Sequence, residues 1–257
     1  MKKQEVIFDD LGIMEYQRAW DYQESLLNAN VLIKSAVRSL QLEGDSDVSN
    51  IDRLPPNPAQ QTTHYFLFVE HPPVYTLGKS GHMENILINE EERIARGIQF
   101  FKINRGGDIT FHGPGQIVGY PILDLEKFDT DIGKYLRNIE EVIIFTLAEY
   151  GIKGERSKGE TGVWIDAGIS GKERKICAIG VRCSRWITMH GFAFNVNTDL
   201  DYFNYIIPCG IRNKKVTSLQ KELGRDVAAG EVKKKIKRNF LDVFQVTAAA
   251  VKNVRNL

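Results

Sequence analysis

The strongest constraint on the fold is the order of helical and strand-like patterns along the chain. Apolar residues recur at steps of three and four within 131–150, which is typical of an amphipathic helix. Helical composition extends over 15–40, and residues 228–251 are predicted to form a final helix. Helices that bracket a strand-rich middle favour an α+β fold, with a mixed or antiparallel sheet packed against helices.

The predicted strands are compact apolar or alternating runs between turn residues. The run YFLFV at 65–69 is the clearest, because Pro72 and Pro73 follow it and cannot continue a ladder. Further strands are predicted at 100–103, 116–125, 162–165, 175–182 and 186–196, and a short charged helix at 89–95.

No internal repeat and no clean boundary divides the 257 residues. We therefore expect a single domain over 1–257, a length that one large domain can fill. The most loop-like segment runs from Glu43 to Thr63 and is rich in Asp, Ser, Asn and Pro, which favour turns. We interpret 43–63 as a surface insertion in that domain.

Charge and cysteine content argue against several classes of function. The chain carries 34 basic and 33 acidic residues, so neither nucleic acid nor an anionic membrane is expected as a partner. No run approaches the ~20 apolar residues of a membrane span. Asp9 and Asp10 interrupt the N-terminal segment, which therefore does not resemble a signal peptide. Three cysteines make a poor disulfide framework, and we expect a cytoplasmic protein.

A glycine-rich segment at 105–116, RGGDITFHGPGQ, is the first candidate site. It holds four glycines, which let a backbone approach a ligand closely, and Arg105 and His112 add a cation and an imidazole. The alternative is a hairpin loop with incidental polar residues. The pattern is neither GxGxxG nor GxxxxGK[ST], so it gives little support to a nucleotide-phosphate loop.

The second candidate segment is 174–196, RKICAIGVRCSRWITMHGFAFNV. Lys175 begins an apolar strand, so its ammonium either reaches the surface along its stem or lies beside a buried site. His190 precedes a glycine, and a lone histidine is more often a structural hydrogen-bonding group than a catalyst. Apolar side chains around Ile179 and Phe192 either line a slot for a ligand or belong to the core.

Cys209 is the third candidate. It lies between Pro208 and Gly210 in YIIPCGI, a turn context, whereas Cys177 and Cys183 lie in strand-like runs that favour burial. An exposed thiol is a liability unless it is used, so Cys209 is a candidate nucleophile. No CxxC, HExxH or Cys/His cluster predicts a metal site, and no GxSxG predicts a serine hydrolase.

Four blocks in this order, RGGDITFHGPGQ, KICAIGVR, HGFAFNV and IIPCGI, resemble the lipoyl(octanoyl) transferase family. The TLG of 76–78 and the GVW of 162–164 match further blocks, so the resemblance spans about 70–219. It implies a single catalytic domain of the biotin and lipoate protein ligase type, with no cofactor. It also implies octanoyl transfer from octanoyl-acyl carrier protein to a lysine of lipoyl domains, those of 2-oxoacid dehydrogenase E2 subunits and the glycine cleavage H protein.

The resemblance also implies roles for individual residues. The acyl-enzyme cysteine falls on Cys209 and the catalytic lysine on Lys175. His190 is a candidate supporting residue on the ground of its place in the second segment, not of the resemblance. The octanoyl-binding positions fall on Arg105, Gly106, Gly107, Asp108, Ile109, Thr110, Phe111 and His112, on Ala178, Ile179 and Gly180, and on Gly191, Phe192 and Ala193.

These residue types suit transfer between two bulky protein substrates. A cysteine can store the acyl group between two visits, which gives ping-pong order. A free thiol is only about 3% thiolate at pH 7, so a positive Lys175 nearby would favour attack. A transiently neutral Lys175 would then accept the proton of the incoming amine. Backbone amides of the glycine-rich segments could stabilise the oxyanion. His112 either orients the site, contacts the acyl end or braces its loop.

Three alternatives remain open at the level of the sequence. An ATP-dependent lipoate-protein ligase shares the fold, but it carries an RRxSGGGAVYHD-like motif where this chain has RGGDITFHGPGQ, and it has no use for Cys209. A transferase acting between two lipoyl-type domains would keep the cysteine. A module that only binds lipoyl domains would not need Lys175 and Cys209. The basic run at Arg212, Lys214 and Lys215 is either solvated surface or a contact for an acidic partner.

Overall fold

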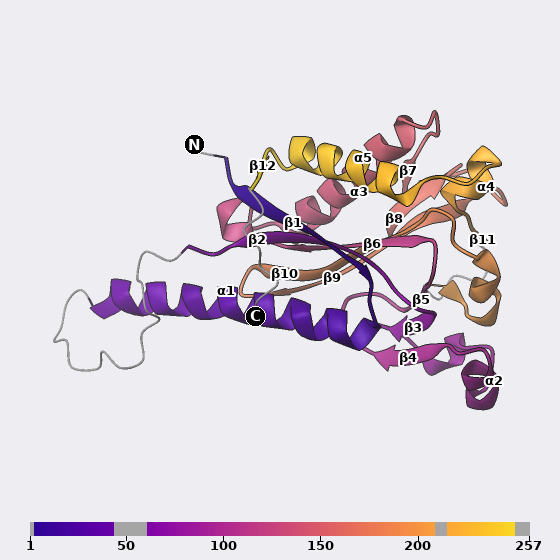
Figure 1. The fold of residues 1–257 in the computed structure, drawn as a ribbon, viewed down its shortest axis with the longest axis horizontal. Helices are drawn as coiled ribbons and strands as arrows, with labels where there is room; N and C mark the ends of the chain where they lie inside the picture. The colour runs from indigo at the N-terminus through magenta and orange to yellow at the C-terminus, as the bar shows by residue number, and fades with distance from the viewer. Residues whose placement is uncertain (1–2, 44–60, 209–214, 250–257) are drawn as a thin grey trace.

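The computed structural model describes residues 3–43, 61–208 and 215–249 (Figure 1). The helices are α1 (Tyr16–Glu43), α2 (Glu90–Ala95), α3 (Ile132–Ala148), α4 (Leu219–Leu223) and α5 (Ala229–Val243). The strands are β1 (Glu5–Ile13), β2 (His64–Glu70), β3 (Val74–Leu77), β4 (Gln99–Lys102), β5 (Ile109–His112), β6 (Gln116–Ile122), β7 (Glu155–Ser157), β8 (Glu160–Ile165), β9 (Arg174–Ser184), β10 (Ile187–Asn195), β11 (Lys215–Val216) and β12 (Thr247–Ala248).

Within the described residues, nine strands form a large mixed sheet. Its order is β12-β1-β2-β6-β10-β9-β8-β7, with β11 paired to β9. Strands β12, β1 and β2 run parallel to one another, whereas β2, β6, β10, β9, β8 and β7 pair antiparallel in turn. The predicted α+β fold with a mixed sheet is confirmed.

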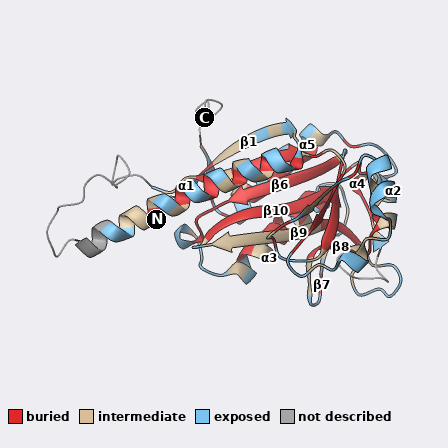
Figure 2. Ribbon diagram, turned by 90° about the horizontal axis from the view of Figure 1, so that it is seen from below, coloured by how far each residue is buried: buried red, intermediate tan, exposed pale blue. Residues whose placement is uncertain are grey.

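Helices cover both faces of this sheet (Figure 1). On one face, Leu26 and Leu27 of α1 pack against a cluster that includes Val118 and Ala193. On the other face, α3 and α5 pack against a cluster that includes Phe192. Adjacent residues of a strand point to opposite faces, which explains how Phe192 and Ala193 reach different clusters. Strands β6 and β10 are consequently buried along their length (Figure 2).

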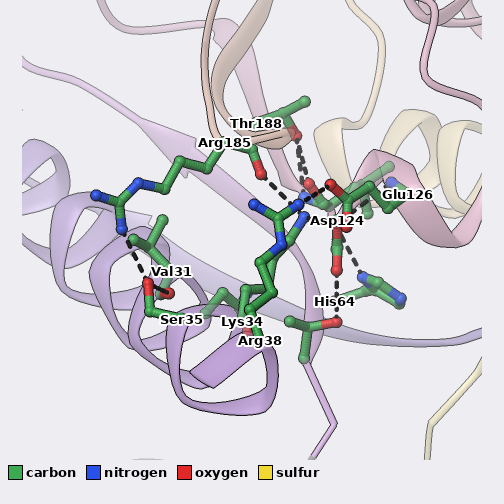
Figure 3. A network of polar contacts seen from close by, with 12 residues as sticks. Val31, Lys34, Ser35, Arg38, His64, Asp124, Glu126, Arg185 and Thr188 are labelled. Carbon is green, nitrogen blue, oxygen red and sulfur yellow. Dashed lines mark hydrogen bonds and ion pairs between the residues drawn. The ribbon is translucent and has the colours of Figure 1, made fainter. Parts of the chain in front are cut away.

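A buried ion pair holds the C-terminal half of α1 to the sheet (Figure 3). Lys34 Nζ lies 2.6 Å from Asp124 Oδ1 and 3.0 Å from Glu126 Oε2. The Thr62 hydroxyl donates to Asp124 Oδ2 at 3.0 Å, and the Asp124 backbone N–H donates to His64 Nδ1 at 3.3 Å. Removing one partner of such a pair leaves a buried charge, so the network fixes where α1 crosses the sheet.

A second sheet, in the order β4-β3-β5, lies beside the N-terminal end of α1 (Figure 1). Strands β3 and β5 pair antiparallel from Val74 opposite His112 to Leu77 opposite Ile109. This sheet has its own apolar cluster, which includes Tyr75 and Phe111. It therefore supports the end of the segment 105–112 through β5.

Several sequence predictions need correction. The final helix ends at Val243 rather than 251, because Gln245 adopts a positive φ of 54° and β12 then pairs with β1. Strand β6 ends at Ile122, and 125–127 form a 3-10 helix instead. Strands β1, β3 and β5 were not predicted. Of the predicted insertion at 43–63, residues 44–60 lie outside the described part of the chain, so it stays a prediction.

Among the helices of residues 3–43, 61–208 and 215–249, none combines the length and the apolar character needed to cross a bilayer.

Candidate functional site

A cavity of about 460 Å³ lies where the large sheet, the small sheet and the start of α1 meet. Its volume falls in the range of small-molecule sites. It brings together residues from all the predicted binding segments: Arg105, Gly106, Gly107, Asp108, Ile109, Thr110 and His112, Ala178, Ile179 and Gly180, and Gly191, Phe192 and Ala193. Lys175 and His190 line it as well. Phe111 does not, because it packs into the small-sheet cluster with its ring stacked on Tyr202.

The edge of β9 facing β8 is open along this cavity. Strand β8 pairs with β9 only between Arg174 and Cys177, and β10 covers the opposite edge. Beyond Cys177 the described residues provide one hydrogen bond to the open edge, from the Gly106 N–H to the Val181 carbonyl at 3.0 Å. Backbone groups of alternate strand residues point to opposite edges, and Val181 points to the open one. The Ile179 N–H and C=O therefore face this edge as well, where they can hydrogen-bond a substrate, as an oxyanion or a carbonyl requires.

The Arg105 side chain is buried and braces the glycine-rich segment. Its guanidinium donates to the carbonyl oxygens of Thr76, Gly106 and Asp108 at 2.8, 2.9 and 2.8 Å, and to the Thr76 hydroxyl at 3.0 Å. Gly107 has a φ of 89°, a conformation that favours glycine. These contacts give Arg105 a structural role in shaping the cavity wall.

The absence of a side chain at Gly180 lets the Arg105 segment pack closely against β9. A Cβ atom there would lie 2.9 Å from both Arg105 Cδ and the Gly106 carbonyl oxygen. We expect Gly180→Ala to lower the free energy of unfolding by about 1–3 kcal/mol, because overpacking a fitted contact forces the backbone to shift.

The matched control is Gly230→Ala in α5, where no atom lies within 4 Å of the added methyl group. We expect it to be neutral or to raise the free energy of unfolding by up to about 1 kcal/mol, because alanine favours a helix. Urea denaturation of both variants measures the difference. Equal effects would contradict the close fit at Gly180.

His112 belongs to a buried chain of hydrogen bonds. The ring accepts from the Thr76 hydroxyl at Nε2 (3.3 Å) and donates from Nδ1 to Gln116 Oε1 (2.9 Å). Gln116 Nε2 donates to Asn195 Oδ1 at 2.8 Å, and Asn195 Nδ2 donates to the Thr217 carbonyl at 3.0 Å. Burial lowers the pKa of His112 well below its usual value, so the ring is neutral. These hydrogen bonds show that His112 braces its loop, and the side chain also lines the cavity.

His190 is likewise buried and neutral. Burial, with a contribution from the Arg105 charge, lowers its pKa to about 3. Its Nε2 lies 3.2 Å from Asn104 Oδ1, and its backbone, at a φ of 59°, donates to Gln23 Oε1 at 2.9 Å. A histidine held in this state is poorly suited to proton transfer near pH 7.

Lys175 is buried, with only 8% of its surface exposed. It pairs directly with Trp164 of β8, and its Nζ lies 4.6 Å from the centre of the Trp164 ring. A cation over a tryptophan face is stabilised by the ring quadrupole. Gly162 of β8 lies beside this stem at a φ of 125°, and a Cβ there would lie only 2.6 Å from the Cys177 carbonyl oxygen. Of the two sequence alternatives for Lys175, the structure supports a buried position beside the cavity.

The thiols that the structure describes are not suited to attack. Cys177 is fully buried, and burial raises its pKa well above the usual value. Burial also raises the pKa of the half-buried Cys183. Cys209, the predicted nucleophile, lies outside the described residues. Arg212 and Lys214 of the basic run lie outside them as well.

The described residues on both sides of 209–214 are tied to this site. Pro208 and Lys175 line one small cavity together with Val216. Ahead of it, the Ile207 N–H donates to the Asn85 carbonyl at 2.7 Å, and the Asn85 side chain donates to the Asp108 carboxylate. On the other side, Val216 of β11 pairs with Lys175.

Sequence reasoning missed several cavity residues: Tyr16, Val118, Tyr120, Ile132, Leu136, Glu160, Thr161 and Val181. Most of them lie in predicted helices or strands, whose patterns give no signal of a ligand site. Glu160 and Thr161 lie just ahead of the strand predicted at 162–165. Only the packing of α1 against the sheet brings Tyr16 to this place. In the described ranges, no group of three or more His, Cys, Asp or Glu side chains is arranged to hold a metal ion.

Comparison with known proteins gives consistent results. Residues 52–241 match the family described as the lipoyl protein ligase A/B catalytic domain. An octanoyltransferase of Christiangramia forsetii is 57% identical over 242 residues, covering 94% of this chain and 96% of the relative. An octanoyltransferase of Flavobacterium psychrophilum is 56% identical over 239 residues, covering 93% and 96%.

Two solved structures share the fold at low sequence identity. A bipartite lipoate protein ligase from Thermoplasma acidophilum has a TM-score of 0.65 at 17% identity, covering 97% of this chain and 88% of its own. A lipoate-protein ligase A bound with ATP has a TM-score of 0.62 at 14% identity, covering 98% and 90%.

Proposed function

Since this chain belongs to the lipoyl protein ligase A/B catalytic domain family, we propose that it is an octanoyltransferase of protein lipoylation. The acyl group would come from octanoyl-acyl carrier protein. The acceptor would be a lysine of lipoyl domains, such as those of 2-oxoacid dehydrogenase E2 subunits and the glycine cleavage H protein. The curated relatives support octanoyl transfer, because they carry this activity in their name and match over almost their whole length.

One observation carries the chemical part of the proposal. Lys175 lines the cavity formed by the predicted binding residues, and Pro208, the neighbour of Cys209, lines a small cavity with the same lysine. Consecutive Cα atoms are 3.8 Å apart, so covalent geometry keeps the Cys209 backbone close to Pro208. The proposed chemistry needs the Cys209 thiol near the Lys175 ammonium, which is the arrangement that suits nucleophilic catalysis.

In the first half-reaction, the Cys209 thiolate attacks the carbonyl carbon of the octanoyl thioester. The bond from that carbon to the carrier sulfur breaks, and the carrier leaves as a thiol after taking a proton from the Lys175 ammonium, which becomes neutral. Lys175 as a cation stabilises the attacking thiolate. The Ile179 N–H, which faces the open edge of β9, is the oxyanion donor that this geometry supports.

In the second half-reaction, the lysine amine of the lipoyl domain attacks the Cys209 thioester. An amide bond forms, the carbon–sulfur bond breaks, and the thiolate of Cys209 is regenerated. The amine loses a proton on the way, and a neutral Lys175 accepts it. Thioester-to-amide transfer is downhill and needs no nucleotide, which separates this route from an ATP-dependent ligase.

Intact-mass spectrometry after mixing with octanoyl-acyl carrier protein tests the proposal. We expect an adduct of octanoyl mass that disappears in Cys209→Ala and persists in the control Cys183→Ala. We expect transfer to a lipoyl domain without ATP. Transfer that occurs only with ATP and free octanoate would instead identify a ligase. An adduct formed from an acylated lipoyl domain, but not from the carrier, would identify a transferase between lipoyl domains.

A further inference from the structure

The residues that line the cavity fall into two groups on opposite faces of the large sheet. Val118, Tyr120 and Ala193 belong to the cluster between the sheet and α1, and Tyr16 of α1 joins them at the cavity. We call these four residues the inner limb. Ile132, Leu136, Ile179 and Val181 lie on the α3 side and form the outer limb. The cavity passes from one face to the other around the open edge of β9.

The inner limb is the better place for an apolar chain. The exposed fractions of Tyr16, Val118, Tyr120 and Ala193 are only 1–4%, whereas the four residues of the outer limb are half-buried. Apolar groups gain most where water is excluded. The nearby imidazoles are neutral because burial lowers the pKa of both His112 and His190.

The length of the inner limb follows from strand geometry. Asn195 of β10 shares the small cavity with Lys175, and Gly191 lies four residues along the same strand. At 3.3–3.4 Å per residue this is about 13 Å. An extended chain advances about 1.2 Å per bond, so an octanoyl group reaches roughly 10 Å from its thioester. Its end therefore arrives near the level of Gly191.

Tyr16 lies at this level. Gly119 pairs with Phe192, so Tyr120 stands opposite Gly191. His71 links the two tyrosines, since its Nε2 is 2.8 Å from the Tyr120 hydroxyl and its ring centre is 5.1 Å from that of Tyr16. The Tyr16 ring is thus positioned where an eight-carbon chain ends.

The Tyr16 ring is also held in place. It stacks on His112 at 5.9 Å between ring centres and contacts Phe101 at 5.3 Å and Trp20 at 6.4 Å. An aromatic ring packed on several sides cannot swing aside without disturbing its neighbours. Tyr16 precedes the family match, which begins at residue 52, so this wall comes from the chain's own N-terminal helix.

We propose that Tyr16 is the end wall of the acyl slot and sets the length of the acyl chain that the enzyme accepts. This inference rests on the proposed octanoyltransferase activity. The substrate class is a straight-chain acyl thioester whose terminal methyl group meets the Tyr16 ring. Each carbon beyond that wall would have to displace the ring or fold back on itself.

The experiment compares acyl loading from hexanoyl-, octanoyl-, decanoyl- and dodecanoyl-carrier protein, measured as kcat/KM by intact mass. Discrimination by a closed apolar slot is typically 10-fold or more per methylene. We expect Tyr16→Ala and Tyr16→Leu to raise the dodecanoyl-to-octanoyl ratio at least 10-fold. Tyr16→Trp should shift the preference toward hexanoyl by a similar factor. Tyr16→Ala and Tyr16→Leu lengthen the slot, whereas Tyr16→Trp shortens it, so the wall is tested in both directions. If one of these variants fails to fold, the remaining ones still test the inference.

Two control variants sharpen the result. Tyr16→Phe keeps the ring and should keep the chain-length profile. Leu136→Ala enlarges the outer limb and should also leave the profile unchanged. A chain-length profile that changes in Leu136→Ala but not in Tyr16→Ala, Tyr16→Leu or Tyr16→Trp would overturn the inference. In that case octanoyl loading of the wild-type protein would still support the proposed function. A wild-type protein that takes no acyl group from any carrier would overturn the proposed function and this inference together.

Discussion

Lys175→Met is expected to lower kcat/KM for octanoyl transfer by about 10²–10⁴-fold, the usual contribution of a positioned acid or base. Methionine preserves most of the buried stem and its contact with the Trp164 face while removing the charge. Both half-reactions should slow, since the thiolate of Cys209 loses its cation and the acceptor amine loses its base. Single-turnover measurements of acyl loading and of acyl discharge to a lipoyl domain separate the two steps.

Lys175→Arg distinguishes the two roles of this residue. Arginine remains charged throughout the accessible pH range, so it can stabilise a thiolate but cannot accept a proton. We expect loading to be less affected than discharge. The control Lys172→Met removes a charge from an exposed position three residues earlier. Wild-type loading and discharge rates in Lys175→Met would contradict the assigned roles.

Acidification is expected to produce the largest change in stability. Burial lowers the pKa of His64 and of His71 to about 4 and that of His190 to about 3, and it lowers the pKa of His112 well below its usual value. In the unfolded chain a histidine titrates near 6.5. The unfolded state therefore binds more protons at low pH, and the stability present above pH 6.5 is lost as the pH falls toward 4.

The size of this effect follows from the pKa shifts. Each pH unit below 6.5 costs about 1.4 kcal/mol per histidine, so each one removes roughly 2 kcal/mol by pH 5. The four together approach the whole stability of a typical domain, about 5–15 kcal/mol. Neutral rings also fit the contacts: the Asp124 N–H donates to His64 Nδ1, which an imidazolium could not accept.

Urea denaturation at pH 7.5, 6 and 5 measures the slope of the free energy of unfolding against pH. His64→Gln should reduce that slope by about one proton, because one buried imidazole no longer titrates. The matched control is His82→Gln, which removes an imidazole from the exposed surface. A slope reduced equally in the two variants, or a free energy of unfolding that stays flat from pH 7.5 to 5, would contradict the prediction.

Local patterns predicted the elements whose formation depends on neighbours in the sequence. The three-and-four spacing at 131–150 gave α3, which begins at the cap where Asp131 accepts from the Lys134 N–H at 3.0 Å. The apolar runs gave β2 and β8–β10. Local patterns failed to predict the elements whose formation depends on pairing with distant segments. Residues 244–249 have the composition of a helix, yet the chain turns at Gln245, and β12 then pairs with β1.

The candidate residues of the proposed chemistry could be read from local sequence: the order of the four motif blocks, the turn context of Cys209, and the glycines at which a backbone can approach a ligand. The environment of each described residue depends instead on how distant segments pack together. The burial of Lys175 against Trp164, the open edge of β9 and the approach of Tyr16 to the cavity all join segments far apart in the chain. Such contacts form because helices must cover both faces of one sheet, and the sequence of any single segment does not show which other segments will pack against it.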